Sequence, residues 1–203
     1  MARNLTQPYE YILPEELLGI RQPITPEQFE ELCGKYDELR LELTSTGELI
    51  VMPPTGSLTG KRNTDLTYQL RAWSKKDATG IGFGPDTGFT LPNGAIRGPD
   101  ASWVRRETWD SLSPEQRDTF APICPDFVVE LRSKSDRLSV LFNKMTEYIE
   151  NGASLGWLID PDNRRIYVYR PDEEMIILDN PESVSGEPLL PGFTLETAEL
   201  WQI

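Results

Sequence analysis

The spacing of apolar residues predicts different elements along the chain. Residues 136–151 carry apolar side chains at helical spacing, which predicts an amphipathic helix that ends at Asn151-Gly152. The apolar stripe of this helix consists of Leu138, Leu141, Phe142, Met145, Tyr148 and Ile149. The run from Phe127 to Leu131 is instead almost continuously apolar, which is typical of a central strand buried on both faces.

Capping residues, turn residues and apolar spacing predict the elements of the N-terminal half. Thr25 is a favourable N-cap and Pro26 a favourable first helical residue, so a short helix should begin there. Thr46-Gly47 interrupts an alternating stretch, as the turn of a hairpin does. We therefore expect a helix over residues 23–34, a hairpin over residues 39–52 and a helix over about residues 59–76.

Turn signals also divide the second half of the chain. Asn93-Gly94 between apolar residues favours a type I′ hairpin turn, which joins a strand near 87–91 to one over 96–104. Ser113-Pro114 is a typical helix start when glutamine stands at the third helical position, as it does here. The C-terminal part predicts a hairpin of strands 155–159 and 166–169, followed by an edge strand over 175–178.

The resulting order of elements, αββαββαβαβββ, indicates an α/β fold around a mixed sheet. The sequence contains no internal repeat, low-complexity tract or Gly/Ser linker that would divide it. We therefore expect one domain over residues 1–203.

The composition excludes several classes of chemistry. Histidine is absent, so His-based triads, His-ligated zinc and imidazole bases are excluded. The two cysteines, Cys33 and Cys124, form no disulfide framework, which favours a reducing compartment. The N-terminus has no apolar run that predicts a signal peptide or a membrane span, so we expect a cytoplasmic protein that is not embedded in a membrane.

The charge is unevenly distributed. The net charge of −13 disfavours a uniform nucleic-acid-binding surface, because phosphate repels an acidic protein. Residues 61–165, however, carry 15 of the 20 basic side chains and an equal number of acidic ones. A local basic groove in this middle segment is therefore an open alternative to an ordinary mixed, solvated surface.

Two carboxylates stand where buried strands normally exclude charge. Asp100 precedes the apolar stretch that begins at Ala101, and Glu130 lies inside the central apolar run. A buried carboxylate must be neutralised, paired or bound to a metal, so Mg²⁺ and structural pairing with arginine are the two interpretations. Asp126 lies four residues before Glu130, about 13 Å away along a strand, too far to share one small cation with it.

Two basic residues are candidates to assist these carboxylates. Arg132 follows Glu130 by two positions and should share its face of the strand. Lys144 lies at the rim of the apolar helical stripe, from which it could reach the end of the sheet or simply extend over the edge of the core.

The order of these motifs resembles a known family. The motifs are Pro99-Asp100, Pro125-Asp126-Phe-Val-Val-Glu130-Leu-Arg-Ser133-Lys-Ser-Asp136, Lys144-x-x-x-Tyr148-x-x-x-Gly152 and Gly156-Trp157-Leu-Ile-Asp160-Pro161. Together they resemble the Uma-type family of restriction-endonuclease-like proteins, within the PD-(D/E)XK nuclease superfamily. The resemblance extends from about Thr25 to Phe193, nearly the whole chain.

This resemblance implies a restriction-endonuclease-like core over about residues 59–170, a mixed sheet flanked by helices, with strands added at both ends. It implies that Asp100 and Glu130 are metal ligands. Arg132 stands where the superfamily usually has lysine, and Lys144 matches the helix lysine of the Uma-type pattern. Glu42 matches a recurring acidic residue that completes the metal site, although it could also be an exposed strand carboxylate. Asn63 is a candidate polar group behind the ligands.

The sequence and the resemblance together lead to one functional hypothesis. Asp100 and Glu130 would hold Mg²⁺, or Mn²⁺ as a substitute, for hydrolysis of DNA, with Lys144 or Arg132 assisting. The candidate DNA contacts are Lys61, Arg62, Arg71, Lys75, Lys76, Arg105, Arg106, Lys134 and Arg137. The alternatives are an inactive module that binds nucleic acid or protein, and a hydrolase of small phosphoesters. A homodimer would let two sites cut two strands. Trp157, Tyr167 and Tyr169 could form its interface, although aromatic strand residues are more often part of the core.

Overall fold

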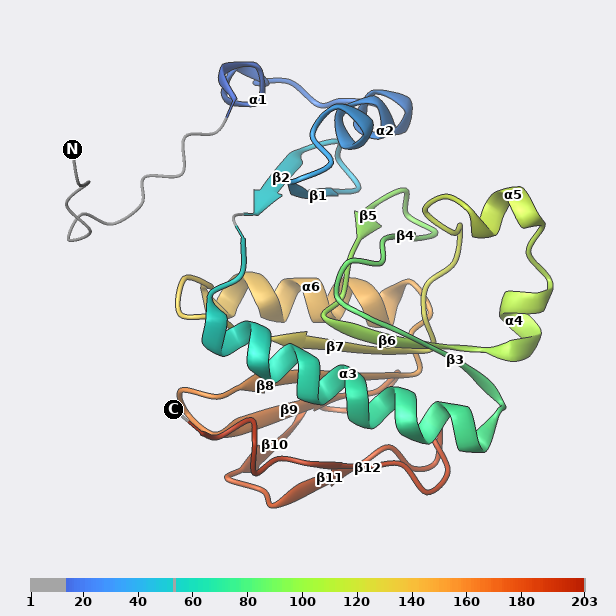
Figure 1. Ribbon diagram of the computed structural model, residues 1–203, viewed down its shortest axis with the longest axis vertical. Helices are drawn as coiled ribbons and strands as arrows, with labels where there is room; N and C mark the ends of the chain where they lie inside the picture. Colours follow the sequence, from blue (N-terminus) through green and yellow to red (C-terminus); the bar gives the residue numbers. More distant parts are fainter. Residues whose placement is uncertain (1–13, 53, 203) are drawn as a thin grey trace, which may run out of the picture.

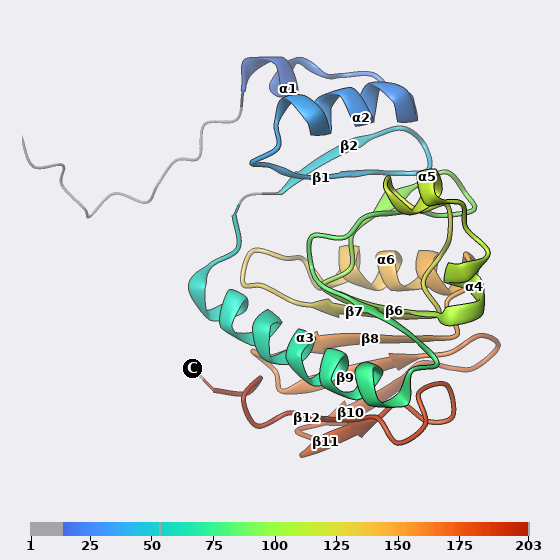
Figure 2. The ribbon, with the colours of Figure 1, turned by 45° about the vertical axis from the view of Figure 1, so that its right-hand side comes forward.

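The structure, a computed structural model, describes residues 14–52 and 54–202 (Figures 1 and 2). The expectations for the segment before residue 14 lie outside the described residues. The predicted α/β class is confirmed, because the fold combines a mixed sheet with helices on both of its faces.

The centre of the fold is a six-stranded sheet with the order β10-β9-β8-β7-β6-β3. Its strands are β3 (Gly80–Phe83), β6 (Ala101–Arg105), β7 (Phe127–Leu131), β8 (Leu155–Asp160), β9 (Arg165–Tyr169) and β10 (Ile176–Asp179). Only β7 and β8 pair in parallel, and all other neighbours are antiparallel. The predicted central strand β7 is buried along its full length, in agreement with its continuous apolar sequence.

Two helices cover opposite faces of this sheet (Figure 1). They are α3 (Ser57–Asp77) and α6 (Leu138–Glu150). Alternate residues of β7 point to opposite faces, so Phe127 and Val129 pack with the core beneath α3, and Val128 packs beneath α6. Glu130 has the same parity as Val128, which directs its carboxylate toward α6.

A second, four-stranded sheet stands beside the α6 layer (Figure 2). Its strands are β1 (Arg40–Leu43), β2 (Leu49–Met52), β4 (Phe89–Thr90) and β5 (Ile96–Arg97), and the helices α1 (Glu15–Gly19) and α2 (Pro26–Lys35) lie above it. The predicted helix start at Thr25 is confirmed by a complete capping box with Gln28. The predicted hairpin over residues 39–52 is confirmed as β1 and β2.

The prediction for residues 87–104 was partly wrong. β4 and β5 form the expected hairpin, but the chain leaves that sheet at Gly98 and enters the six-stranded sheet as β6. The turn is not type I′, because only Gly94 has a positive φ, of 85°. Pro92 has its φ fixed near −65°, which suits the second position of a type I turn, and the Gly94 N–H donates to the Leu91 carbonyl.

The remaining elements are short or follow the predicted order. The helices α4 (Arg106–Asp110) and α5 (Pro114–Arg117) precede β7, and the C-terminal pair β11 (Ser183–Ser185) and β12 (Thr194–Glu196) follows β10. The predicted capping box at Ser113 is present in α5. The sequence reading missed α1, β3, α4, β11 and β12 as separate elements, because each is too short to show a period.

Aromatic side chains fill the core on the α3 side of the sheet. Trp157 stacks on Phe193 with ring centroids 5.9 Å apart, and Phe127 meets Trp157 edge-on at 4.8 Å. Trp157 and Tyr167 are buried, which agrees with the interpretation of these residues as core, and Tyr169 is half-buried.

Candidate active site

Three carboxylates from three elements meet where the two sheets join. Glu42 comes from β1, Asp100 from the connection between β5 and β6, and Glu130 from β7. Their exposed fractions are 2%, 7% and 4%, respectively. The alternative reading of Glu42 as an exposed strand carboxylate is therefore wrong.

Backbone hydrogen bonds attach Asp100 to the strand that carries Glu130. The Asp100 N–H donates to the Val129 carbonyl at 2.9 Å, and the Leu131 N–H donates to Asp100 Oδ2 at 2.8 Å. These two bonds bracket Glu130, so the position of Asp100 beside it does not depend on any side-chain rotamer of Glu130.

Lys144 of α6 links two of the three carboxylates. Its Nζ lies 2.8 Å from Glu130 Oε1 and 2.7 Å from Glu42 Oε1. The Tyr148 hydroxyl, one helical turn later, donates to Glu130 Oε1 at 3.1 Å. The amphipathic pattern of α6 thus buries Tyr148. Lys144 lies at the edge of the apolar stripe, and its long side chain extends from there to the end of the sheet.

Two arginines from the small sheet and its connection complete the cluster. Arg97 bonds Glu42 Oε2 at 3.2 Å and Glu147 Oε2 at 2.6 Å. Arg40 bonds Asp100 Oδ1 at 3.2 Å and the Gly98 carbonyl at 2.5 Å. We call Glu42, Asp100, Glu130, Arg40, Arg97 and Lys144 the carboxylate cluster.

Asn63 connects the carboxylate cluster to α3. Its Nδ2 donates to Asp100 Oδ1 at 3.2 Å, whereas its buried Oδ1 has no hydrogen-bond partner within the described part of the chain. An unpaired buried acceptor is costly, so this atom is suited to a donor that a bound group or water would bring.

The pKa values follow from burial and charge. Burial raises the pKa of Glu130 to about 7, against the attraction of Lys144 and with help from the nearby charges of Asp100 and Glu42. Burial also opposes ionisation of Glu42, but Lys144, Arg97 and the Gly98 N–H outweigh it and lower the Glu42 pKa. Burial disfavours the Lys144 ammonium, yet Glu130 and Glu42 raise its pKa above the ordinary value. Lys144 is therefore charged at neutral pH.

The donor set fits a hard divalent cation in an open site. Among residues 14–52 and 54–202, no three His, Cys, Asp or Glu side chains are grouped to enclose a metal ion. Mg²⁺ does not require such a cage, since one or two carboxylates suffice when waters and phosphate supply the other oxygens. Burial disfavours the ionised form of Glu130 although Lys144 lies beside it, and a cation would favour that ionised form.

Several candidate residues lie away from the carboxylate cluster. Arg132 follows the last residue of β7 and pairs with the buried Asp160 of the neighbouring strand β8 at 2.9 Å, so its guanidinium is engaged there. Asp126 pairs with Arg105 at 2.9 Å, at the end of β7 opposite to Glu130. The predicted separation of Asp126 from Glu130 agrees with this placement.

The predicted DNA contacts are scattered. Lys61 pairs with Glu199, and Arg62 is buried and donates to the Gln202 carbonyl, so both hold the C-terminal segment. Arg106 donates to the Ala78 carbonyl at the far end of β6. Lys134 and Arg137 are exposed on the loop between β7 and α6.

Sequence reasoning missed Arg40, Arg97 and Glu147 as parts of the site. Arg40 and Arg97 stand in short strands with no local signal of function, and Glu147 lies on an otherwise ordinary helix. Only the alternation of β1 places Arg40 and Glu42 on one face, and this spacing is a weak signal that many exposed strands share.

Comparisons with known proteins agree with this fold and with the resemblance in the sequence. The chain belongs to the Uma2 family, because the family model described as "Uma2: Putative restriction endonuclease" matches residues 26–198. No curated protein matches the chain.

A solved structure is also similar to this chain. It is described as a "putative nuclease belonging to DUF820 from Anabaena variabilis", with 23% identity and a TM-score of 0.73. The match covers 88% of this chain and 98% of that chain, which confirms the predicted nuclease fold. None of the helices in the described part of the chain is both long and apolar enough to span a membrane.

Proposed function

We propose that the protein is a metal-dependent endonuclease that hydrolyses phosphodiester bonds in DNA. The observation that carries the proposal is the pair Asp100 and Glu130. Backbone hydrogen bonds to β7 fix Asp100 beside Glu130, and Glu130 faces the charged Lys144. Membership in the Uma2 family supports the same reaction class.

In this proposal Asp100 and Glu130 hold Mg²⁺, or Mn²⁺ as a substitute. When bound, such a cation lowers the pKa of a coordinated water and polarises a phosphoryl oxygen. Asn63 and Arg40 keep Asp100 in place through its Oδ1 atom.

Lys144 provides electrostatic assistance. Because its pKa is raised, it keeps its proton and cannot act as a general base. It instead donates hydrogen bonds that orient the attacking water or stabilise charge that develops on the phosphoryl group. Glu42 anchors Lys144, since both Glu42 oxygens are occupied by Lys144, Arg97 and the Gly98 N–H. In this proposal Glu42 therefore orients Lys144 and stays a candidate third ligand, because the oxygens of Asp100 are hydrogen-bonded in the same way. Arg132 is held by Asp160, away from the carboxylate cluster.

Cleavage of supercoiled plasmid tests the proposal. Wild-type protein with Mg²⁺ or Mn²⁺ should nick or linearise the plasmid, and the Glu130→Gln and Asp100→Asn variants should lose at least about 100-fold in rate. Asp126→Asn is the matched control, because its carboxylate lies at the other end of the same strand. Equal cleavage by wild type and Glu130→Gln would refute the site assignment.

An inactive binding module is the competing function. One observation favours it: Lys144 already neutralises part of the charge on Glu42 and Glu130 without any metal. A working site should bind Mg²⁺ and raise the melting temperature by mass action, by several degrees at saturating metal. If wild-type protein shows no thermal shift with Mg²⁺ and no cleavage, the result would favour the binding module.

We also propose that the protein is a homodimer formed at β10. This edge strand leaves Ile176 and Ile177 exposed, at 46% and 47%, and an unpaired apolar edge invites pairing with a second strand. Light scattering should give the mass of a dimer for wild type and of a monomer for Ile177→Lys. A monomeric wild type would overturn this proposal.

A cytoplasmic location is part of the proposed function. Cys33 and Cys124 are both free thiols in the structure, as expected in a reducing compartment. Burial raises the pKa of Cys33 to about 11 and that of Cys124 to about 12, so neither is a reactive thiolate.

A further inference from the structure

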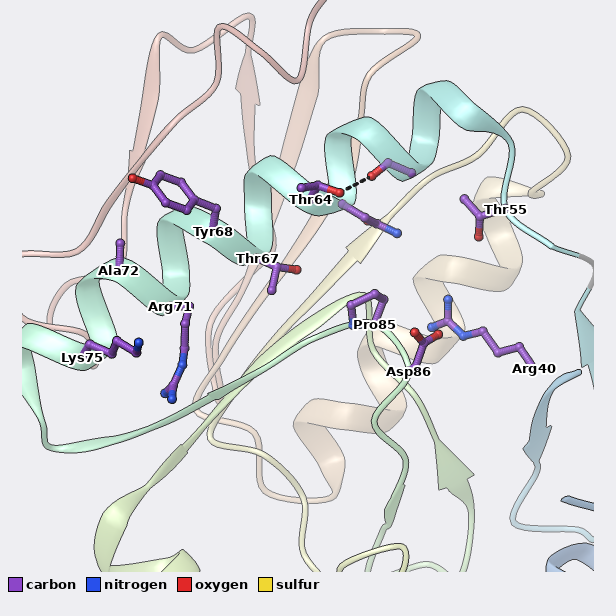
Figure 3. Close-up of a pocket in the computed structure, with 12 residues that line it drawn as sticks. Arg40, Thr55, Thr64, Thr67, Tyr68, Arg71, Ala72, Lys75, Pro85 and Asp86 are labelled. Carbon is purple, nitrogen blue, oxygen red and sulfur yellow. Dashed lines mark hydrogen bonds between the residues drawn. The ribbon is translucent and has the colours of Figure 1, made fainter. Parts of the chain in front are cut away.

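A cavity of about 860 Å³ runs along α3 and ends at the carboxylate cluster (Figure 3). Asn63 and Arg40, the two side chains that bond Asp100 Oδ1, line the end of this cavity. Pro85 and Asp86, from the connection between β3 and β4, line it opposite the helix. The cavity is therefore continuous with the proposed active site, and we call it the α3 groove.

One stripe of α3 forms the floor of the α3 groove. The stripe consists of Gly60, Asn63, Thr64, Thr67, Tyr68, Arg71, Ala72 and Lys75. Successive members are alternately three residues and one residue apart, so they share one helical face. From Asn63 to Lys75 the helix rises about 18 Å, at about 1.5 Å per residue. This length matches several nucleotides of one strand, each of which advances about 3.4 Å in a helix.

The chemistry of the stripe suits both parts of a nucleotide. Tyr68 is 70% exposed, which leaves its ring free to stack on a base. Arg71 and Lys75 are exposed, lie one helical turn apart and have no ion-pair partner within residues 14–52 and 54–202. With Arg40, the groove has three cationic residues and one acidic residue, Asp86.

Unpaired polar atoms concentrate toward the end of the α3 groove that adjoins the carboxylate cluster. Arg40 Nε, Asn63 Oδ1 and Thr67 Oγ1 are buried without a hydrogen-bond partner in the described part of the chain, and all three residues line the cavity. Asn63 itself is more than nine-tenths buried. Buried polar groups are normally satisfied, so this concentration indicates that a polar ligand belongs at this end.

We propose that the α3 groove binds a single DNA strand and leads its backbone to the carboxylate cluster. Tyr68 stacks on a base, and Arg71 and Lys75 contact successive phosphates. This inference rests on the proposed nuclease function, which it deepens by naming the form of the substrate.

Duplex DNA fits the α3 groove poorly. The groove is a cavity lined by one helix face and one connecting segment, whereas a duplex requires a broad positive surface. The net charge of −13 and the pairing of Arg105 and Lys61 with carboxylates reduce the positive surface available to a duplex. A stacking aromatic beside cations is typical of sites for single strands.

Fluorescence anisotropy with a labelled 12-nucleotide strand and with the same sequence as a duplex tests this inference. The full-length Glu130→Gln variant without metal should bind the single strand at least about tenfold more tightly than the duplex. Adding Tyr68→Ala should weaken binding about tenfold, as expected for loss of one stacking contact, while Tyr68→Trp should preserve it. Adding Arg71→Ala with Lys75→Ala should reduce the salt slope by about 1.4, because each lost phosphate contact removes about 0.7.

Two further variants sharpen the test. Lys76→Ala removes the same charge one residue away, outside the groove, and should leave strand binding unchanged. Asp86→Asn removes the one acidic side chain of the groove and should tighten strand binding. The five substituted side chains of the groove and its control, Tyr68, Arg71, Lys75, Lys76 and Asp86, are exposed. These substitutions should therefore leave the melting temperature of the Glu130→Gln background unchanged.

The outcomes separate this inference from the nuclease proposal. Equal affinity for duplex and single strand, or wild-type-like binding by the Tyr68→Ala and Arg71→Ala/Lys75→Ala variants, would overturn the groove assignment even if plasmid is cleaved. Groove-dependent binding of the single strand without any cleavage by wild-type protein would support the groove assignment and remove the nuclease proposal.

Discussion

The two faces of the six-stranded sheet use their buried residues for opposite purposes. On the α3 side, Phe127 and Trp157 pack with other aromatic rings, and hydrophobic burial supplies the stabilisation. On the α6 side, Glu130 and Lys144 replace apolar side chains at the end of the sheet and must compensate each other. Buried ion pairs contribute little net stability. The charged site on the α6 side therefore stabilises the fold less than apolar packing there would, and the apolar core on the α3 side supplies more of the stability.

The largest effect on stability should come from removing a buried aromatic side chain on the α3 side of the sheet. Trp157→Ala removes a fully buried indole and leaves a cavity, so we expect a loss of about 3–5 kcal/mol in the free energy of unfolding, measured in urea. Trp109 is only half-buried and lies outside this cluster, so Trp109→Ala should cost less. Similar losses for the two variants would show that the α3 side is not the main source of stability.

Substitution of a charged residue on the α6 side should lower the cleavage activity. Lys144→Met keeps the length of the side chain but removes the hydrogen-bond donor, so metal-dependent cleavage should fall about 100- to 1000-fold. Plasmid cleavage under single-turnover conditions measures this change. Lys35→Met, at an exposed lysine of α2 that pairs with Glu16, is the matched control. A Lys144→Met enzyme with wild-type rates would mean that the ammonium does not assist the reaction.

The third largest effect should be a pH dependence of stability that comes from Glu130 on the α6 side of the sheet. Because the Glu130 pKa is raised to about 7, the folded state holds its proton where the unfolded state, near 4.5, has lost it. Without metal, stability contributed by Glu130 is therefore present below about pH 4.5 and is lost as the pH rises to about 7. Urea melts across this window should show a smaller decline for Glu130→Gln than for wild type, and parallel curves would contradict the shift.

The smallest effect should come from exposed charges near the site. Lys134 and Arg137 lie on the loop between β7 and α6, and their replacement by alanine should weaken binding equally for all DNA sequences. Each substitution should reduce the salt slope of binding by about 1 if the residue contacts a phosphate. An unchanged slope would remove these residues from the interface.

Local sequence signals accounted for much of the fold. Capping boxes at Thr25 and Ser113, the stripe of α6 and the apolar run of β7 each depend on residues within a few positions of one another. Such signals survive in any tertiary context, so the corresponding elements agreed with the structure. The burial cost of a carboxylate likewise directed attention to Asp100 and Glu130 from the sequence alone.

The tertiary structure determined which strands pair and which charged side chains meet. That β5 and β6 belong to different sheets, that Arg132 turns to Asp160, and that Arg40 and Arg97 close the carboxylate cluster all depend on partners distant in the sequence. The α3 groove likewise exists only because α3 packs opposite the connection between β3 and β4. Periodicity specifies which face of an element is buried, but the choice of partner follows from packing of the whole chain, since many charged pairs have similar energies in isolation.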